Sequence, residues 1–388
     1  MKGYRLLVIA WYAGITHVSE FIKNLKSCNP CAEVSLLTSK PSLNEVPKEL
    51  IESTVEIFCC KYYSGHIKNK LIAGLVTRFY FIRTFFRLSK KNYDIVDIHF
   101  AKPRLYHVRH WIKMISDNIV ISPWGSDVLR VEGERNIKRL RKVYAIARYV
   151  TVGKDSQIGQ RLVSEMKVAP DKLVRLGWGG ELFDYIRENA IRVTPDEAKA
   201  RFDLNGRYVI TCGYNTQKEQ RHEEILNAIA SVRDQLPENL TLLFPFTYGR
   251  APENAGYIEF IKEEGRRLGF DLVAVEEHLN LPDLFLLRMA TDMFVHVQTT
   301  DAGSRCVMEY VSCNKKVVHG SWMRYAYLED YHPSCYFPVD KIENLGECIV
   351  KAYKAQVEPL PKEVVDIILE RGWKYKMGLW NGFFESLV

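Results

Sequence analysis

The chain alternates short apolar runs with amphipathic segments, and this alternation predicts parallel sheets covered by helices. Segments with helical periodicity, such as HVSEFIKNL and RNIKRLRKVYAIA, lie between the apolar runs of the first half. Such an alternation is typical of a doubly wound sheet whose ligands bind at the carboxyl ends of its strands. The strands expected in this half are Arg5–Ala10, Glu33–Thr38, Ile95–Phe100, Ile119–Ser122 and Tyr149–Val152.

The same rhythm restarts after a polar stretch, which predicts a second domain of the same kind. Residues 187–206 (RENAIRVTPDEAKARFDLNG) carry no strand pattern and are expected to contain the domain boundary. Further strands are expected in RYVITCG, TLLFPFT, LVAV, MFVHV and KKVVHG. The predicted fold class is therefore α/β, with two Rossmann-like doubly wound domains, residues 1–188 and 189–369, facing each other across a cleft. The aromatic-rich segment 370–388 is predicted to be a docked helix.

Length and composition agree with a two-domain globular protein inside the cell. The chain has 388 residues, of which 47% are hydrophobic and 26% charged. No apolar run approaches the ~18 residues needed to span a bilayer. The start, MKGYRLLVIAWYAG, superficially resembles a signal peptide, but it lacks a small-residue cleavage pattern and is better explained as a buried strand. Nine cysteines, an odd number, do not form the pattern of a disulfide framework or of a zinc site, so we expect a cytoplasmic protein without a metal.

The net charge of +7 is unevenly distributed along the chain. The segment Lys61–Tyr93 holds eight Lys or Arg and no acidic residue, and aromatic residues lie among Arg78, Arg83 and Arg87. A basic, aromatic helix of this kind can lie on an anionic membrane surface. It can equally be a helix buried on two sides whose arginines reach out to solvent. No nucleic-acid-binding motif is present, and we expect no nucleic-acid partner.

Two carboxylates flank a glycine turn in the stretch QTTDAGSRCVMEYVSCNKKVVHG. Asp301 precedes the turn at Gly303, and Glu309 lies inside the helix expected to follow. A helix N-terminus with unpaired amides suits a diphosphate, to which Ser304 and Arg305 would add donors. A carboxylate inside the helix could hold the two hydroxyls of a ribose. The spacing also fits a helix capped by Asp301 with a surface pair between Arg305 and Glu309, so both interpretations stay open.

This stretch resembles the E-x7-E segment of the group 1 (family four) GT-B glycosyltransferases, two-domain enzymes that use nucleotide sugars. The resemblance implies that Glu309 holds the donor ribose and that Asp301 lies beside the donor sugar. It extends over nearly the whole chain, because LGWGGELF resembles the family's hinge approach and CYFPVDKIENLGECIVKA its closing strand and helix. It implies that the first domain binds the acceptor, that the second binds the nucleotide sugar, and that segment 370–388 crosses back to the first domain.

Three motifs of the first half carry further parts of the resemblance. WYAGITHVSEFIKNL resembles the family's glycine loop, which implies that Gly14 and His17 line the cleft or the acceptor site. DIVDIHF resembles the strand that ends in a histidine facing the transferred sugar, here His99. ISPWGSDVL closely matches the family's Trp-Gly-Ser-Asp turn and makes Trp124 and Asp127 site candidates, the latter catalytic together with His99. Each has a structural alternative: a turn for Gly14 and His17, a satisfied strand-end histidine, a core tryptophan, and a helix cap for Asp127.

The chain departs from the family after the first strand of its second half. An arginine and a lysine usually bind the donor phosphates there, whereas this chain reads GYNTQKEQRH, so we expect Lys218 and Arg221 to take that role. The segment FPFTYGRAPENAGYIEFIKEEGRRLGF is similar to bacterial fucosamine transferases that extend lipid-linked enterobacterial common antigen. The group 1 resemblance implies retention of anomeric configuration, which we favour, and this second resemblance implies inversion.

The sequence therefore predicts a hexosyl-type glycosyltransferase that needs no metal and no cofactor beyond its nucleotide-sugar substrate. Its expected acceptor is a saccharide or lipid-linked saccharide, a cell-surface glycan precursor of bacterial polysaccharide biosynthesis. A position on the inner face of the cytoplasmic membrane follows if Lys61–Tyr93 contacts lipid. Two alternatives remain: a catalytically silent glycan- or membrane-binding protein on the GT-B fold, and a GT-B nucleotide-sugar epimerase.

Overall fold

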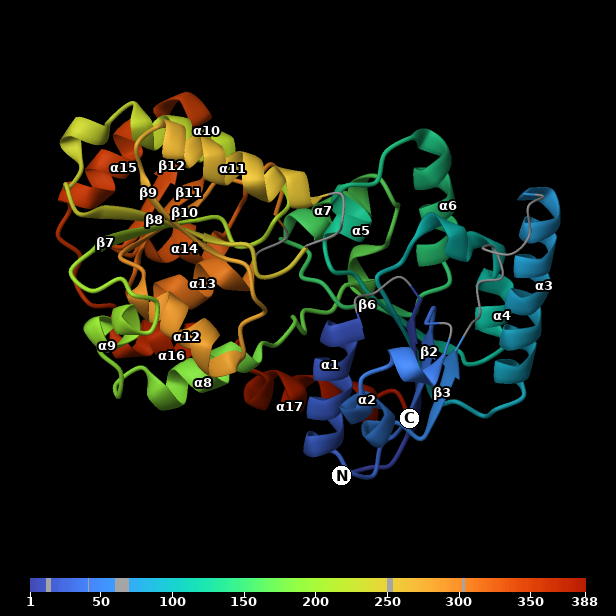
Figure 1. Cartoon of the computed structure of the whole chain (residues 1–388). Helices are drawn as coiled ribbons and strands as arrows, with labels where there is room; N and C mark the ends of the chain where they lie inside the picture. Colours follow the sequence, from blue (N-terminus) through green and yellow to red (C-terminus); the bar gives the residue numbers. More distant parts are fainter. Residues whose placement is uncertain (12–14, 41, 60–69, 250–253, 302–303) are drawn as a thin grey trace. The chain divides into compact units, whose positions relative to one another are not determined.

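The chain forms two compact units, which the computed structural model describes except at residues 12–14, 41, 60–69, 250–253 and 302–303. The first unit comprises Met1–Gly179 with Trp373–Val388, and the second comprises Gly180–Gly372 (Figure 1). Each unit contains one six-stranded sheet in which all pairings between neighbouring strands are parallel. The division falls at Gly179, earlier than the boundary expected near residue 188, because the polar stretch 187–206 is folded into the second unit.

The sheet of the first unit has the strand order β3-β2-β1-β4-β5-β6. Strands β1 and β4, the two at the centre, consist mostly of apolar residues, and every position of β4 and all but the first of β1 are buried, as a sheet covered by helices on both faces requires. The strand order reverses between β1 and β4, so the loops after these two strands diverge and leave a crevice at their carboxyl ends. The strands are β1 (Arg5–Ala10), β2 (Glu33–Thr38), β3 (Glu56–Cys59), β4 (Ile95–His99), β5 (Asn118–Ser122) and β6 (Tyr149–Val150).

Helix α17, near the chain's C-terminal end, packs with its aromatic side chains on α1 of the first unit. Trp380 and Phe384 are fully buried there, and the ring centroids of Phe21 and Trp380 lie 5.0 Å apart. The helices of this unit are α1 (Ile15–Cys28), α2 (Lys48–Ser53), α3 (Lys70–Ser89), α4 (Arg109–Lys113), α5 (Ser126–Leu129), α6 (Glu134–Tyr144), α7 (Gln157–Ser164) and α17 (Trp373–Glu385), with single 3-10 turns η1 (Leu43–Glu45), η3 (Pro103–His107) and η4 (Pro170–Lys172).

The sheet of the second unit has the order β12-β11-β10-β7-β8-β9, so its strand order reverses between β7 and β10. These two central strands pair directly in parallel, with Met293 opposite Ile210 and Val295 opposite Cys212. The ligand crevice of a doubly wound sheet is therefore expected beyond Cys212 and His296, where β7 and β10 end. The strands are β7 (Tyr208–Cys212), β8 (Leu240–Pro245), β9 (Asp271–Val275), β10 (Met293–His296), β11 (Lys316–Gly320) and β12 (Tyr336–Val339).

Helices cover both faces of this second sheet, as Figure 1 shows. Helix α9 begins with a capping box, in which the side chains of Thr194 and Glu197 each accept a hydrogen bond from the other's backbone amide. The helix packs on α12. The helices are α8 (Glu181–Asn189), α9 (Pro195–Ala200), α10 (His222–Ala230), α11 (Ala255–Arg267), α12 (Leu281–Ala290), α13 (Arg305–Ser312), α14 (Ala326–Tyr331), α15 (Leu345–Lys354) and α16 (Lys362–Leu369), with 3-10 turns η5 (Lys218–Gln220), η6 (Arg233–Gln235) and η8 (Ile342–Asn344).

Helix α3 covers most of the basic segment singled out in the sequence, and residues 61–69 of that segment lie outside the described residues. Its inner side chains Phe85 and Leu88 are fully buried. The opposite side exposes an apolar stripe at helical spacing, which rules out burial on two sides for the described part of the helix. The exposed stripe consists of Ile72, Leu75, Phe79, Ile82 and Phe86. Across the described parts of the chain, no helix combines the length and apolar character needed to cross a membrane.

Candidate functional site

The loop after β7 begins with a glycine whose conformation only glycine adopts without strain. Gly213 has φ +64°, and its amide donates to the carbonyl oxygen of Val295 in β10 at 3.0 Å. A Cβ atom at this position would lie 2.8 Å from Nε2 of His222 and 2.9 Å from Oε1 of Gln220. The backbone of this turn is therefore packed directly against the side chains of the following loop.

The loops after β7 and β10 are tied together by the buried side chain of Gln220. Its Nε2 donates to Oε1 of Gln298 at 2.7 Å, and its Oε1 accepts from the amide of Tyr214 at 3.3 Å. A backbone hydrogen bond from Thr299 to Glu219 adds a second tie at 3.0 Å. The two loops that diverge at the switch point thus form one continuous edge.

Lys218 and Arg221, the cations expected to bind the donor phosphates, both lie on this edge. Lys218 is exposed, with its ammonium 5.6 Å from the ring centroid of Tyr257. Arg221 adopts the left-handed conformation (φ 61°), and its guanidinium lies 5.4 Å from the ring of Trp322. Two cations at the carboxyl end of β7 are well placed to neutralise an anionic group bound there.

Asp301 is a buried acceptor rather than an exposed turn residue. Its Oδ2 accepts from Nε2 of His296 at 3.0 Å, from the amide of Ser304 at 3.0 Å, and from the hydroxyl of Tyr325. Burial alone would raise the pKa of Asp301, but these hydrogen bonds and the nearby imidazole outweigh it and lower the pKa below its ordinary value. The carboxylate is therefore ionised and locked in place beside Tyr214, whose ring lies 5.5 Å from that of His296.

Ser304 and Arg305 open helix α13, while Gly303 lies outside the described residues. The hydroxyl of Ser304 caps the helix by accepting from the amide of Cys306 at 3.2 Å. Arg305 lies against the backbone of Gly180, where a Cβ would come within 2.9 Å of its Nη1. The structure thus brings Asp301, Ser304 and Arg305 together at the start of one helix.

Glu309 lies inside α13 and is only 6% exposed, which excludes the surface ion pair as an explanation of its spacing. Its Oε2 accepts from Nε and Nη2 of Arg288, at 3.0 and 2.9 Å, in a buried salt bridge. Arg288, in α12, also donates to the hydroxyl of Tyr310 at 3.2 Å. Any contact of Glu309 with a ribose would therefore share this carboxylate with Arg288.

In the first unit, His99 ends β4 at the corresponding reversal of strand order. Its Nε2 lies 2.9 Å from Oδ2 of Asp97, whose Oδ1 accepts from the hydroxyl of Ser122 at 2.7 Å. When Nε2 donates to Asp97, the lone pair of a neutral imidazole lies on Nδ1, and this atom has no hydrogen-bond partner in the described parts of the chain. The ring is only 1% exposed, so a sugar reaches it only if a neighbouring side chain moves.

Aromatic rings enclose His99, and two of the other candidates belong to this group. The ring centroid of Trp124 lies 6.2 Å from that of His99 and 5.4 Å from that of His17, whose side chain is half exposed. Phe21 and Trp178 complete the enclosure, with centroids 4.9 and 5.0 Å from His99. The structure therefore joins His17, Trp124 and His99, whereas Gly14 lies outside the described residues.

Asp127 closes the turn after β5 and is completely buried. Its Oδ1 accepts from the amides of Trp124 and Gly125, both at 2.9 Å, and its Oδ2 has no partner among the described residues. Burial raises the pKa of Asp127 to about 6, although the two amides and Lys102 act in the opposite direction. The side chain of Asp127 therefore both caps the turn through Oδ1 and carries a carboxyl group with a raised pKa.

Several residues of the site were missed in the sequence. His296 and Tyr325 hold Asp301, Arg288 holds Glu309, and Gln220 ties the two loops. His296, the fourth residue of MFVHV, offered a usable signal, because it resembles in position the histidine that ends IVDIH. Arg288 gave none, because an arginine in an amphipathic helix normally points to solvent.

Comparison with known proteins rests on solved structures, since neither a family model nor a curated protein matches the sequence. A glycosyltransferase from Rickettsia africae has a TM-score of 0.73 at 13% identity and covers 100% of this chain and 99% of its own. Anabaena HepE in complex with UDP and glucose has a TM-score of 0.65 at 12% identity, covering 99% and 100%. The lipopolysaccharide outer core galactosyltransferase WaaB has a TM-score of 0.65 at 10% identity, also covering 99% and 100%.

These similarities span both units and confirm the predicted α/β fold class, with two Rossmann-like doubly wound domains as in GT-B glycosyltransferases. Identities of 9–15% show a common fold and no more. The likeness to fucosamine transferases stays a prediction. In the described parts of the chain, no three His, Cys, Asp or Glu side chains are grouped so that they could hold a metal ion.

Proposed function

We propose that this protein is a glycosyltransferase that moves a hexosyl-type sugar from a nucleoside-diphosphate donor to a glycan precursor, without a metal ion. The observation that carries the proposal is the edge of the second sheet at its switch point. There the loop of Lys218 and Arg221 is hydrogen-bonded to Gln298 and Thr299, in the segment that leads to α13, on a fold shared with glycosyltransferases. HepE, one protein with this fold, has been seen with UDP-glucose, which makes a uridine donor the first to test.

The donor's diphosphate is assigned to the amides at the start of α13 and to the two cations. A helix N-terminus and positively charged side chains stabilise the charge that develops on a departing diphosphate, because they are oriented before the reaction begins. In this proposal Arg305 and Ser304 add donors, Asp301 lies beside the sugar, and Glu309 holds the ribose while Arg288 keeps its carboxylate in place.

The acceptor is assigned to the first unit, where His99 and Asp127 would act on the reacting groups. Nδ1 of His99, which has no partner among the residues that the structure describes, could accept a hydrogen bond from a hydroxyl, and Asp97 fixes the ring's orientation through Nε2. Asp127, with a pKa of about 6, can exchange a proton near neutral pH. Trp124 and His17 would border the sugar. We favour retention of anomeric configuration.

The proposed acceptor is a lipid-linked saccharide of bacterial polysaccharide biosynthesis, reached at the cytoplasmic face of the membrane. Support comes from α3, whose exposed apolar stripe is flanked by the exposed cations Arg83, Arg87 and Lys90. Such a surface binds anionic lipid by burying apolar area and by electrostatic attraction. WaaB, which shares the fold, acts on lipopolysaccharide outer core.

A transfer assay tests the proposed function. Purified protein is incubated with radiolabelled UDP-, GDP- and TDP-sugars and a bacterial lipid extract, and label in the organic phase is measured. We expect one nucleotide sugar to give product, and we expect the His99→Ala variant to lose most of that product while still binding the donor. Donor binding without any product from the wild type would support the silent alternative.

That alternative, a GT-B-fold binding protein without activity, has one specific observation in its favour. His99 and Asp127, the two proposed catalytic residues, are 1% and 0% exposed. A reaction at these groups requires the surrounding aromatic side chains to move when the substrates bind. Tryptophan fluorescence offers a direct check, since Trp124 and Trp178 both pack around His99.

A further inference from the structure

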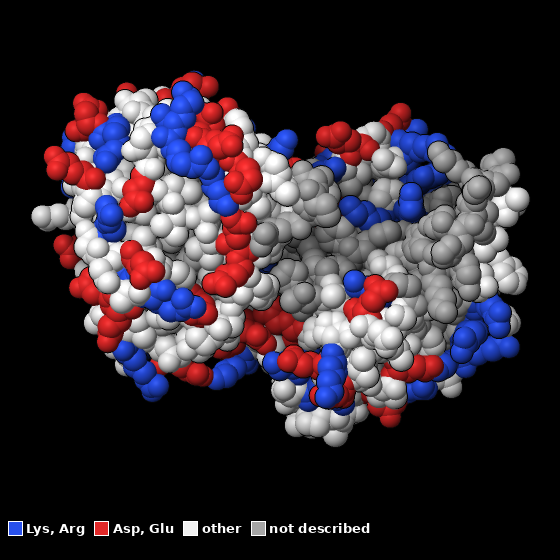
Figure 2. Space-filling view, in the orientation of Figure 1, with Lys and Arg blue, Asp and Glu red and all other residues white. Residues whose placement is uncertain are grey.

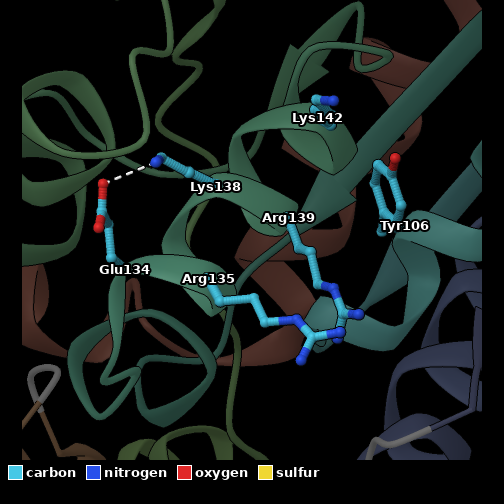
Figure 3. Close-up of a pocket in the computed structure, with 6 residues that line it drawn as sticks. All are labelled: Tyr106, Glu134, Arg135, Lys138, Arg139 and Lys142. Atoms are coloured by element: carbon cyan, nitrogen blue, oxygen red, sulfur yellow. Dashed lines mark ion pairs between the residues drawn. The ribbon is translucent and has the colours of Figure 1, made fainter.

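A pocket of about 380 Å³ lies between η3 and α6 in the first unit, and its lining includes none of the candidate residues described above. It is lined by Tyr106, Glu134, Arg135, Lys138, Arg139 and Lys142 (Figure 3). Arg135 and Arg139 extend toward the same region, whereas Glu134 is turned toward Lys138 (Figure 3). Four of the six lining residues are cationic, so the pocket has a strong positive charge.

The acidic residue of the pocket pairs with only one of its four cations. Glu134 pairs with Lys138 one helical turn along, with Oε1 and Nζ 2.7 Å apart. Within the described parts of the chain, no acidic side chain forms an ion pair with Arg135, Arg139 or Lys142. Arg135 and Arg139 are also one turn apart on the same helix, a spacing at which like charges repel. Without an anion, this arrangement costs free energy.

Tyr106 holds part of the pocket in a fixed geometry. The guanidinium of Arg109 lies 4.0 Å from its ring centroid, and Nη1 of Arg109 donates to the Tyr106 carbonyl oxygen at 2.5 Å. The ammonium of Lys142 lies 5.4 Å from the same ring. Cation–π contacts of this kind position charged groups without neutralising them. Because η3 packs on α6, the aromatic wall and the basic wall are held together.

We propose that this pocket binds a phosphate or diphosphate ester group. Arginine forks match the geometry of phosphate oxygens and bind them through paired, charge-assisted hydrogen bonds. Its lining residues all belong to the first unit, none of them is among the residues proposed to hold the donor, and the proposal does not depend on transferase activity. The pocket lies in the same unit as the apolar stripe of α3, since α3 packs on α4 and α4 on η3. The phosphate can therefore belong either to a lipid headgroup or to a phosphorylated molecule in solution.

Isothermal titration of the full chain with inorganic diphosphate tests the proposal, and a repeat on proteins that also carry Lys218→Gln with Arg221→Gln removes the contribution of the proposed donor site. Three proteins are compared: wild type, a pocket variant carrying Arg135→Gln, Arg139→Gln and Lys142→Gln, and a control carrying Lys48→Gln, Lys154→Gln and Lys341→Gln. The control removes the same charge from exposed positions outside the pocket. Thermal melting of all three checks that they are folded.

A second arm distinguishes the two sources of phosphate. Each protein is sedimented with vesicles of equal parts phosphatidylglycerol and phosphatidylcholine, and with phosphatidylcholine vesicles alone. We expect the pocket variant to bind diphosphate about tenfold or more weakly than wild type and control, because it loses three charge-assisted contacts. A parallel loss of binding to phosphatidylglycerol vesicles would assign the pocket to a lipid headgroup, and intact vesicle binding would assign it to a soluble phosphate ester. Equal diphosphate and vesicle binding by all three proteins would overturn the proposal.

Discussion

Glu309 has a structural task that any functional role must accommodate. Its carboxylate neutralises Arg288, and both side chains are almost completely buried, at 6% and 5% exposure. Replacing one partner of a buried ion pair leaves the other charge without compensation, which costs more than the pair itself contributes. Loss of function in a Glu309 variant is therefore informative only when stability is measured beside it.

We predict that Glu309→Ala lowers the free energy of unfolding by about 3–5 kcal/mol, because the charge of Arg288 then stays buried and unpaired. Glu309→Gln keeps an acceptor for Arg288 and should cost less. The double variant Arg288→Met with Glu309→Met should recover much of the loss. Urea denaturation of the four proteins measures this, and equal stability of wild type and Glu309→Ala would show that the buried pair is not formed.

Asp127 should make the stability of the protein depend on pH. Its pKa is raised from 3.8 to about 6 in the folded chain, so the folded state binds more protons than the unfolded state between these values. Its contribution to the free energy of unfolding is fully present below the unfolded pKa and is lost as the pH rises through 6. The total change is on the order of 3 kcal/mol.

We predict that Asp127→Asn keeps the hydrogen bonds from Trp124 and Gly125 but removes this pH dependence. The variant and the wild type should be equally stable near pH 4, and the variant should become the more stable of the two as the pH approaches 7. Denaturant unfolding at several pH values measures the difference. A stability difference that does not change between about pH 4 and pH 7 would argue against a raised pKa.

The sequence allowed the candidate residues to be named, but it did not predict which side chains surround them. Asp301, Ser304 and Arg305 follow one another, and their position at a helix start follows from the glycine turn and the apolar periodicity after it. The partners Arg288 and Tyr325 come from other elements. Their distance from Glu309 and Asp301 is set by tertiary packing, which no local pattern encodes.

At the scale of elements, the exposed face of α3 is the surface through which the proposed membrane contact would be made. Its stripe of exposed apolar side chains recurs every three or four residues, with cations beside it (Figure 2 shows Lys and Arg across the surface). An isolated exposed apolar residue needs no explanation, but a continuous helical stripe marks a surface that contacts something apolar. A membrane is the occupant best matched to its adjoining positive charge.

We predict that Leu75→Glu with Phe79→Glu abolishes sedimentation with phosphatidylglycerol vesicles, because it places negative charge in the apolar stripe. A matched control, Ile191→Glu with Ile367→Glu, changes two exposed apolar residues of the second unit and should leave binding intact. Equal vesicle binding by both variants would refute the membrane surface. A change of oligomeric state confined to the α3 variant would assign the stripe to a second copy of the chain.

Helix α6 carries a prediction of its own. Arg139→Gln should raise the free energy of unfolding at low salt by about 0.2–0.5 kcal/mol, since it removes a like-charge pair one turn apart. Lys138→Gln, which removes the partner of Glu134, should lower it. Adding inorganic diphosphate should make the wild type more stable than Arg139→Gln. Urea titrations with and without diphosphate measure this, and an order of stability unaffected by diphosphate would contradict an anion-binding role.

Element boundaries followed from the sequence where apolar runs were long and failed where they were short. Two strands of the first sheet were expected at Arg5–Ala10 and Glu33–Thr38 and lie there. Strand β3 was missed because it is a four-residue edge strand, only partly buried, with a glutamate at its start. The polar stretch 187–206 is expected to contain the domain boundary, whereas the two units divide between Gly179 and Gly180 and the stretch includes helix α9, which begins with a capping box.

At the scale of the whole molecule, the two units repeat one design. In each, the strand order reverses beside the first strand, at β4 and at β10, and the strand beside it ends in a buried histidine. Nε2 of each histidine is bonded to an aspartate, Asp97 for His99 and Asp301 for His296. Periodicity alone was enough to predict this doubled architecture, because the strands of a covered parallel sheet are apolar throughout.

The central claim is that the second unit binds a nucleotide sugar at the edge formed by Lys218, Arg221 and α13. Thermal unfolding with UDP-, GDP- and TDP-sugars tests it most directly, on wild type, on Lys218→Gln with Arg221→Gln, and on the control Arg266→Gln with Arg267→Gln. One nucleotide sugar at a hundredfold excess over Kd should stabilise wild type and control by about 2.7 kcal/mol, and the edge variant much less. No stabilisation of the wild type by any of these nucleotide sugars would contradict the claim.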